Sequence, residues 1–141
     1  MIYILLAAVL YTAALLLGAY ASRHANTSVV AAITNIISAT IPIAAVAYEW
    51  SRHPLQNERA GLIAAALGGV AVAFFVLVLN KSFVVNKVAV VSPIVFGGAI
   101  FLSAILGWII FKERITPYQG VGLILLAIGL GFITYAKATG K

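Results

Sequence analysis

Residues 88–111 read VAVVSPIVFGGAIFLSAILGWIIF and contain no charged side chain between Lys87 and Lys112. A transmembrane helix needs about 20 consecutive apolar residues, so this run is long enough to cross a bilayer. Strands of membrane barrels are shorter, with about 10 residues of alternating polarity. The run therefore predicts a membrane-spanning helix.

The same pattern recurs along the rest of the chain. All charged residues lie outside five uncharged runs, and only 9% of the 141 residues are charged, against about 25% in soluble domains. In lipid, runs of this length satisfy their backbone polar groups by forming helices. We therefore expect an all-α integral membrane protein in which residues 1–141 form a single transmembrane domain. The expected transmembrane helices cover residues 2–21, 28–48, 61–80, 88–111 and 118–136.

The composition argues against several functional classes. The net charge of +6 is spread over every loop instead of forming one patch, so we expect no nucleic-acid partner. The chain has no cysteine and no aspartate, and His24 and His53 lie in different loops, so we expect neither a metal site nor a cofactor. Sequence signatures of hydrolases, zinc peptidases and phosphate-binding loops are absent, and we expect the protein not to be an enzyme.

Polar residues inside the second run are candidates for a solute pathway. Thr34, Asn35 and Ser38 occur there, and at about 100° per residue Asn35, Ser38 and Pro42 share one helix face. Pro42 removes one backbone hydrogen bond and leaves a carbonyl oxygen available. Broken helices in transporters use such groups to bind substrate. The alternative is that the polar side chains bond to a neighbouring helix and Pro42 only kinks the span.

Two further features of the spans have possible functional roles. Tyr11 is the one tyrosine that lies far from the expected membrane borders, where Tyr and Trp usually gather. In the fourth run, Ser92 and Pro93 are followed one turn later by Gly97 and Gly98. This combination predicts a bendable point, which is either a hinge or a static kink.

The second half of the chain resembles a known family. Ser92-Pro93 lies within an apolar helix, and residues 107–131 read GWIIFKERITPYQGVGLILLAIGLG. An acidic and a basic residue close one helix in this stretch, and Gln-Gly opens a glycine-spaced helix. These features are similar to the EamA-type branch of the drug/metabolite transporter superfamily.

The resemblance implies an arrangement and an activity. Typical EamA-type transporters contain two five-helix repeats that lie inverted in the membrane. This chain would be one repeat, a half-transporter that pairs with an antiparallel copy of itself. The expected function is transport of small metabolites or amphipathic solutes by alternating access, in the plasma or inner membrane of a cell.

The distribution of basic residues supports this arrangement independently. The side of a membrane protein that carries more Lys and Arg usually faces the cytoplasm, so the difference between the two sides sets the orientation. Here the two sides are nearly equal, with four basic residues against five, which predicts a dual topology. One side carries Arg52, Arg59, Lys112 and Arg114, and the other carries Arg23, Lys81, Lys87, Lys137 and Lys141.

A more distant similarity links the chain to the small multidrug resistance proteins, which are also dual-topology dimers. Gly122 and Gly129 lie on one helix face and resemble the glycine pair in the last, dimerising helix of those proteins. We expect both glycines at the dimer interface, although packing within one bundle is the alternative. The small multidrug resistance proteins rely on a glutamate in their first helix. The first span here has no acidic residue, so their proton-coupled mechanism is not expected. Glu113 is expected to be structural.

The expected solute pathway contains no charged side chain. Without a fixed charge in its wall, the solute should be neutral, zwitterionic or amphipathic. Two rival functions remain open: a lipid-carrier flippase subunit in a heterodimer, and a non-transporting membrane scaffold or regulatory subunit. The candidate lining residues are Tyr11, Thr34, Asn35, Ser38 and Ser92.

Overall fold

The computed structural model describes residues 1–52 and 58–140, and within these ranges every regular element is helical. Five helical segments are long and apolar enough to cross a membrane, which confirms the predicted all-α protein with five transmembrane helices. Three consecutive elements, α4, η1 and α5, together make the fourth span, Val88–Ile110. The elements are α1 (Ile2–His24), α2 (Thr27–Trp50), α3 (Arg59–Val85), α4 (Val88–Ser92), η1 (Pro93–Gly97), α5 (Gly98–Ile110) and α6 (Pro117–Thr139).

Several helices continue past the uncharged runs that define the predicted spans. The C-terminal part of α1 includes Arg23, and the last turns of α3 include Lys81. Long basic side chains can extend to water from a helix end, so a charge does not stop the helix. The start of α2 is set locally, because the Asn26 side chain accepts hydrogen bonds from the backbone N–H groups of Ser28 at 2.9 Å and Val29 at 3.4 Å.

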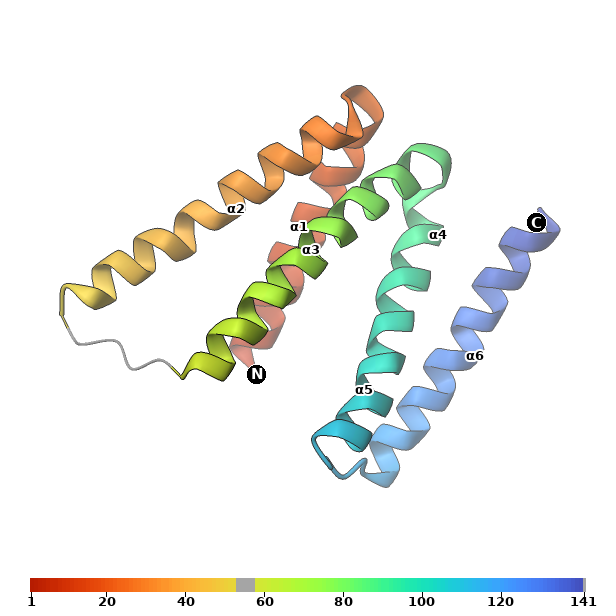
Figure 1. Cartoon of the computed structure of the whole chain (residues 1–141). Helices are drawn as coiled ribbons and strands as arrows, with labels where there is room; N and C mark the ends of the chain where they lie inside the picture. The colour runs from red at the N-terminus through yellow and green to blue at the C-terminus, as the bar shows by residue number, and fades with distance from the viewer. Residues whose placement is uncertain (53–57, 141) are drawn as a thin grey trace. The chain divides into compact units, whose positions relative to one another are not determined.

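The chain divides into two compact units, Met1–Val85 and Asn86–Lys141. In the first unit the three helices α1, α2 and α3 pack against one another (Figure 1). The grouping of residues 1–141 as a single domain stays a prediction. The buried residues among those described in this unit lie at one end of the three helices, which we call the packed end: Ala19, Ser22, Val30, Ala31, Asn80 and Phe83.

A basic residue joins two helices at the packed end. The Nε atom of Arg23 in α1 donates a hydrogen bond to the Phe83 carbonyl oxygen of α3 at 3.2 Å. The acceptor lies in the last turn of α3, where the helix dipole favours a positive charge. The side chain of Phe83 is 1% exposed and anchors the same end of α3 in the core of the unit.

In the second unit, one π-helical turn interrupts the fourth span. Residues Pro93–Gly97 form η1 between α4 and α5. Pro93 has no N–H to donate to the preceding turn, and a local π turn is one way for a helix to absorb that loss. The predicted bendable point thus coincides with a π turn, while hinge motion there stays a prediction.

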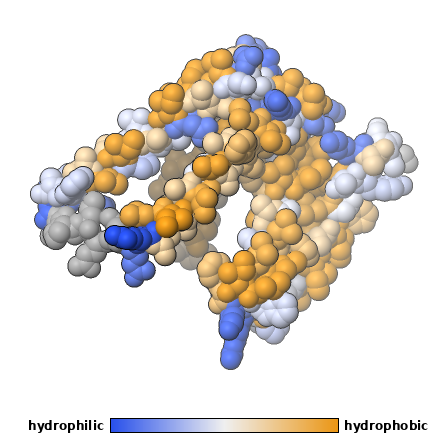
Figure 2. All heavy atoms as spheres, viewed as in Figure 1, coloured by the Kyte–Doolittle hydropathy of each residue, from blue (hydrophilic) through white to orange (hydrophobic). Residues whose placement is uncertain are grey.

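Hydrophobic side chains are exposed over most of the helices. None of the residues Pro117–Thr139 of α6 is buried, although the helix packs against η1 and α5. Figure 2 shows hydrophobic residues along the visible helices and hydrophilic residues gathered at helix ends. Such surfaces are suited to contact with lipid chains or with other transmembrane helices.

Candidate functional site

The polar side chains of α2 form hydrogen bonds with their own helix. Asn35 is half-buried, and its Nδ2 atom donates to the Ala31 carbonyl oxygen at 2.9 Å. Ser38 is exposed, and its Oγ atom donates to the Asn35 carbonyl oxygen at 3.1 Å. Such bonds partly satisfy polar groups in a membrane without a partner on another helix. Thr34 is exposed on the same helix.

Pro42 lies inside α2, which continues through it to Trp50. In a regular helix residue 42 would donate its N–H to the Ser38 carbonyl oxygen, and proline has no N–H. The Ser38 carbonyl oxygen therefore loses its usual donor. Because Ser38 shares a helix face with Asn35 and Pro42, this face carries an available acceptor beside two polar side chains.

The remaining candidates for the pathway belong to different units. Tyr11 lies on α1 with 49% of its surface exposed, in the same unit as α2. Ser92 is the last residue of α4 in the second unit, and its buried Oγ atom has no hydrogen-bond partner in the described chain. Four of the five candidates therefore lie in the first unit, and Ser92 lies in the second: Tyr11, Thr34, Asn35 and Ser38 are the four. A pathway shared by all five candidates stays a prediction.

One polar residue in the core was not among the sequence candidates. Asn80 of α3 is 4% exposed, and its Nδ2 atom has no hydrogen-bond partner in the described part of the chain. Its position next to Lys81 at the end of an uncharged run suggests a membrane border, which is why sequence alone does not mark it. A buried amide without a partner is costly and is therefore a candidate for binding a buried water.

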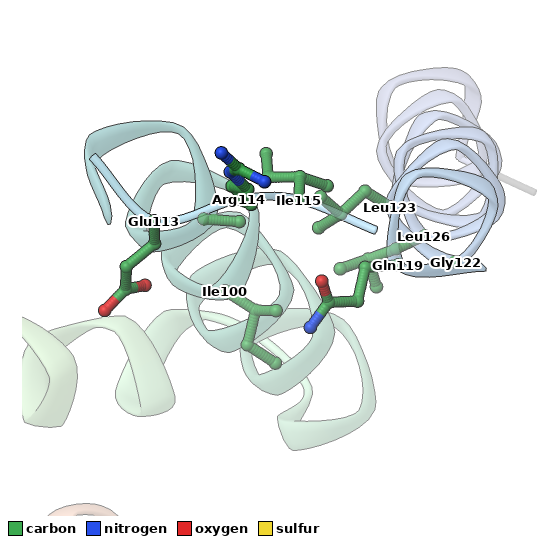
Figure 3. Close-up of a pocket in the computed structure, with 9 residues that line it drawn as sticks. Ile100, Glu113, Arg114, Ile115, Gln119, Gly122, Leu123 and Leu126 are labelled. Atoms are coloured by element: carbon green, nitrogen blue, oxygen red, sulfur yellow. The ribbon is translucent and has the colours of Figure 1, made fainter. Parts of the chain in front are cut away.

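A groove lies between α5 and α6, which we call the α5–α6 groove (Figure 3). Its volume is about 300 Å³. The polar residues that line it come from the segment between the two helices and from the first turn of α6: Glu113, Arg114 and Gln119. The remaining walls are formed by apolar and small residues: Ile100, Ala104, Ile115, Gly122, Leu123 and Leu126.

A capping box orients Gln119 at this groove. The Gln119 Oε1 atom accepts a hydrogen bond from the Thr116 backbone N–H at 2.8 Å, and the Thr116 Oγ1 atom accepts one from the Gln119 N–H at 3.4 Å. Pro117 at the first helical position suits the same helix start. In Figure 3 the Gln119 amide points into the space beside Ile100, so its Nε2 atom is a donor facing the groove.

The segment between the two helices folds back onto α5. The backbone N–H of Glu113 donates to the Gly107 carbonyl oxygen at 3.3 Å. The Glu113 Oε2 atom lies 3.1 Å from the position that a Cβ atom on Gly107 would occupy. The glycine therefore allows the carboxylate to lie close to α5, which suits the structural role expected for Glu113.

Gly122 and Gly129 lie on the exposed surface of α6. A Cβ atom added to either glycine would have no atom within 4 Å, apart from the neighbouring residues and the backbone of α6 itself. Gly122 also borders the α5–α6 groove, and a role for the pair in a dimer interface stays a prediction. His24 bonds through Nδ1 to the Tyr20 carbonyl oxygen at 2.8 Å, whereas His53 lies outside the described residues.

These features define a multi-pass integral membrane protein whose described charged residues lie near helix ends or between helices, with a polar face on α2. A family model described as the EamA-like transporter family matches residues 1–135, and the chain belongs to this family. It is thereby a membrane transporter of the drug/metabolite transporter superfamily, whose members are transporters and generally not enzymes. No match was found among curated proteins or among solved structures.

Proposed function

We propose that the protein is a half-transporter that moves small solutes by alternating access as an antiparallel, dual-topology homodimer in the cell membrane. The observation that carries the proposal is the division of basic residues, with four on one side of the predicted spans and five on the other. Orientation depends on such an imbalance, and here the imbalance is a single charge.

The basic residues lie at helix ends, where they can influence insertion. Arg59 begins α3, Lys87 is the N-cap residue of α4, and Lys112 follows the end of α5. Lys141, one of the five on its side, lies outside the described residues. The three acidic residues, Glu49, Glu58 and Glu113, all fall on the side with four basic residues. Acidic residues contribute little to orientation, so they do not restore a preference.

The odd number of spans determines how two copies with opposite orientations are related. With five helices, the ends of the chain lie on opposite sides of the membrane, so copies inserted both ways form an inverted pair. The exposed surface of α6 with Gly122 and Gly129 is the candidate contact between them. Small residues let helix backbones approach closely in lipid, which supports this choice.

The solute pathway is proposed to include the polar face of α2 and the residues Tyr11, Thr34, Asn35, Ser38 and Ser92. Asn35 and Ser38 are uncharged, and the Ser38 carbonyl oxygen is an additional acceptor next to Pro42. A pathway of this kind suits neutral, zwitterionic or amphipathic solutes, because a strongly ionic solute would lack a charged partner.

A pair of reporters at the C-terminus tests the topology. Green fluorescent protein, active in the cytoplasm, and alkaline phosphatase, active outside it, are fused separately after Lys141 in a bacterial host. Both fusions should be active. Activity of only one fusion would refute the dual topology.

Charge variants make this test sharper. Replacing Lys81 and Lys87 by alanine leaves three basic residues on that side against four, so the phosphatase activity should rise and the fluorescence fall. Replacing Arg52 and Arg59 by alanine leaves two against five and should shift the reporters in the opposite direction. The matched control Lys81→Arg with Lys87→Arg keeps the charges and should change neither reporter.

The purified chain then separates the rival functions. As a homodimer it should carry solutes in proteoliposomes without any other protein. Activity that appears only with a second, different half-transporter and a lipid-linked carrier would favour a heterodimeric flippase. Absence of transport together with stable binding to another membrane protein would favour a scaffold.

A further inference from the structure

We propose that the α5–α6 groove is a binding site for one zwitterionic phospholipid, with the phosphate at Arg114 and part of an acyl chain between the two helices. This site lies within the second unit and does not depend on the proposed transport pathway.

The walls of the groove suit a hydrocarbon chain. Ala104 of α5 faces the groove together with Leu123 and Leu126 of α6. Ile100 also lines it and is 55% exposed, so the groove opens to the surroundings of the helix pair, which in a membrane are lipid. The volume of about 300 Å³ is at the lower end of small-molecule sites, which suits a chain segment and not a transmembrane helix.

The polar end of the groove suits a phosphate and an amine. Arg114 has a guanidinium group, which binds phosphate oxygens through paired hydrogen bonds, and the Gln119 Nε2 atom is a further donor. Glu113 is exposed and also lines the groove, and its carboxylate beside Gly107, which points away from Arg114 in Figure 3, is the acceptor for an ammonium group at the far end of the headgroup. Within the described residues, Glu113 and Arg114 form no ion pair with each other or with another residue, so both charges are available to a headgroup.

The charges of the lining favour one class of phospholipid. Arg114 and Glu113 are the charged residues of the lining, with one charge of each sign. A net anionic headgroup would meet the Glu113 carboxylate without an amine to neutralise it. A headgroup with one phosphate and one ammonium complements both charges, and phosphatidylethanolamine has this chemistry.

The experiment measures labelling of the full-length protein in detergent by phosphatidylethanolamine that carries a photoreactive diazirine on one acyl chain. Labelled peptides should come from the groove walls. Arg114→Gln should lower labelling there about tenfold, because it removes a charge-assisted hydrogen bond to the phosphate. Ala104→Phe fills the groove and should lower labelling to a similar degree.

Two matched variants control for general effects. Ala99→Phe introduces the same ring at an exposed position of α5 outside the lining, and Arg59→Gln removes another basic residue at a helix end. Both should label like the unmodified protein, and all variants should elute as single species of unchanged size. Equal losses in the controls, or full labelling of both groove variants, would overturn the site.

Competition distinguishes the possible occupants. Unlabelled phosphatidylethanolamine should displace the probe, whereas phosphatidylglycerol should need about tenfold more because of Glu113. Displacement by soluble glycerophosphoethanolamine or inorganic phosphate at equal concentration would show that the acyl chain is not bound. Protection of the groove by dimerisation alone would show that a second copy occupies it, and either result overturns the proposal.

Discussion

The Cδ2 atom of Leu130 in α6 lies 2.8 Å from the position that a Cβ atom on Gly97 would occupy. Gly97 is the last residue of the π turn η1 and is buried. The contact allows α6 to approach the interrupted part of the fourth span with only a hydrogen atom between backbone and side chain. Close helix packing at a glycine is typical of membrane proteins, where van der Waals contact drives helix association.

Substitution of Gly97 should therefore destabilise the protein more than substitution of its neighbour. Gly98 has no atom within 4 Å of an added Cβ, so Gly98→Ala is a matched control with the same gain in helix propensity. We expect Gly97→Ala to be less stable than Gly98→Ala by about 1 kcal/mol, since the Leu130 side chain must move. Unfolding in mixed dodecyl maltoside and dodecyl sulfate micelles measures the difference. Adding Leu130→Ala to Gly97→Ala should remove the clash, and equal stability of the two glycine variants would contradict the contact.

Lys112 has a φ of 54° and so lies in the left-handed region that favours glycine. A side chain costs about 1–2 kcal/mol in this conformation. Lys112→Gly should therefore be more stable than Lys112→Ala by about 1 kcal/mol in the same micelles. Both variants lose the same positive charge, so the comparison isolates the backbone. Identical unfolding midpoints would show that Lys112 is not strained.

The buried amide of Asn80 should reduce the stability of the first unit. Asn80→Leu replaces it by an apolar side chain of similar size and should stabilise the protein by about 1–3 kcal/mol, because an unpaired N–H is removed. Asn80→Ala also removes the amide but leaves a cavity, so it should be less stable than the leucine variant. A loss of stability in Asn80→Leu would indicate that the amide has a partner, such as a buried water.

Asn35 is the residue of the proposed pathway whose replacement should be most informative. Asn35→Leu removes the polar group from the face that also holds Ser38, and we expect it to reduce uptake to background while the dimer stays intact. Uptake is measured in proteoliposomes with radiolabelled zwitterionic amino acids and uncharged sugars, and the dimer by cross-linking. Asn80→Leu is the same substitution outside the proposed pathway and should retain uptake. Unchanged uptake by Asn35→Leu of every solute that the native protein carries would contradict its role.

The helices could be predicted from the sequence because each one satisfies its own backbone hydrogen bonds in lipid. The uncharged run 88–111 already predicts a span that the structure has at Val88–Ile110. The ends of the helices are harder to predict from the sequence, because α3 continues past Lys81. Its long side chain can extend to water from inside the helix, so the position of a charge does not mark the last helical residue.

The candidate site was predictable to the extent that it depends on one helix. The shared face of Asn35, Ser38 and Pro42 follows from helix periodicity, which is a property of residues close in sequence. The capping box of Thr116 and Gln119 is also local and could have been found from its spacing. Asn80 was missed because its burial depends on how α1, α2 and α3 pack around the same end.

The sequence by itself determined that this protein lies in a membrane and that it has five spans. It also determined the near balance of basic residues that supports two orientations. These depend on the order of residues along the chain and on the hydrogen bonding of single helices. The tertiary structure alone decided that Leu130 packs on Gly97, that Glu113 lies against Gly107 and that α5 and α6 leave a groove between them. Such contacts depend on the shapes of side chains that meet only after the helices associate, and no periodicity in the sequence encodes them.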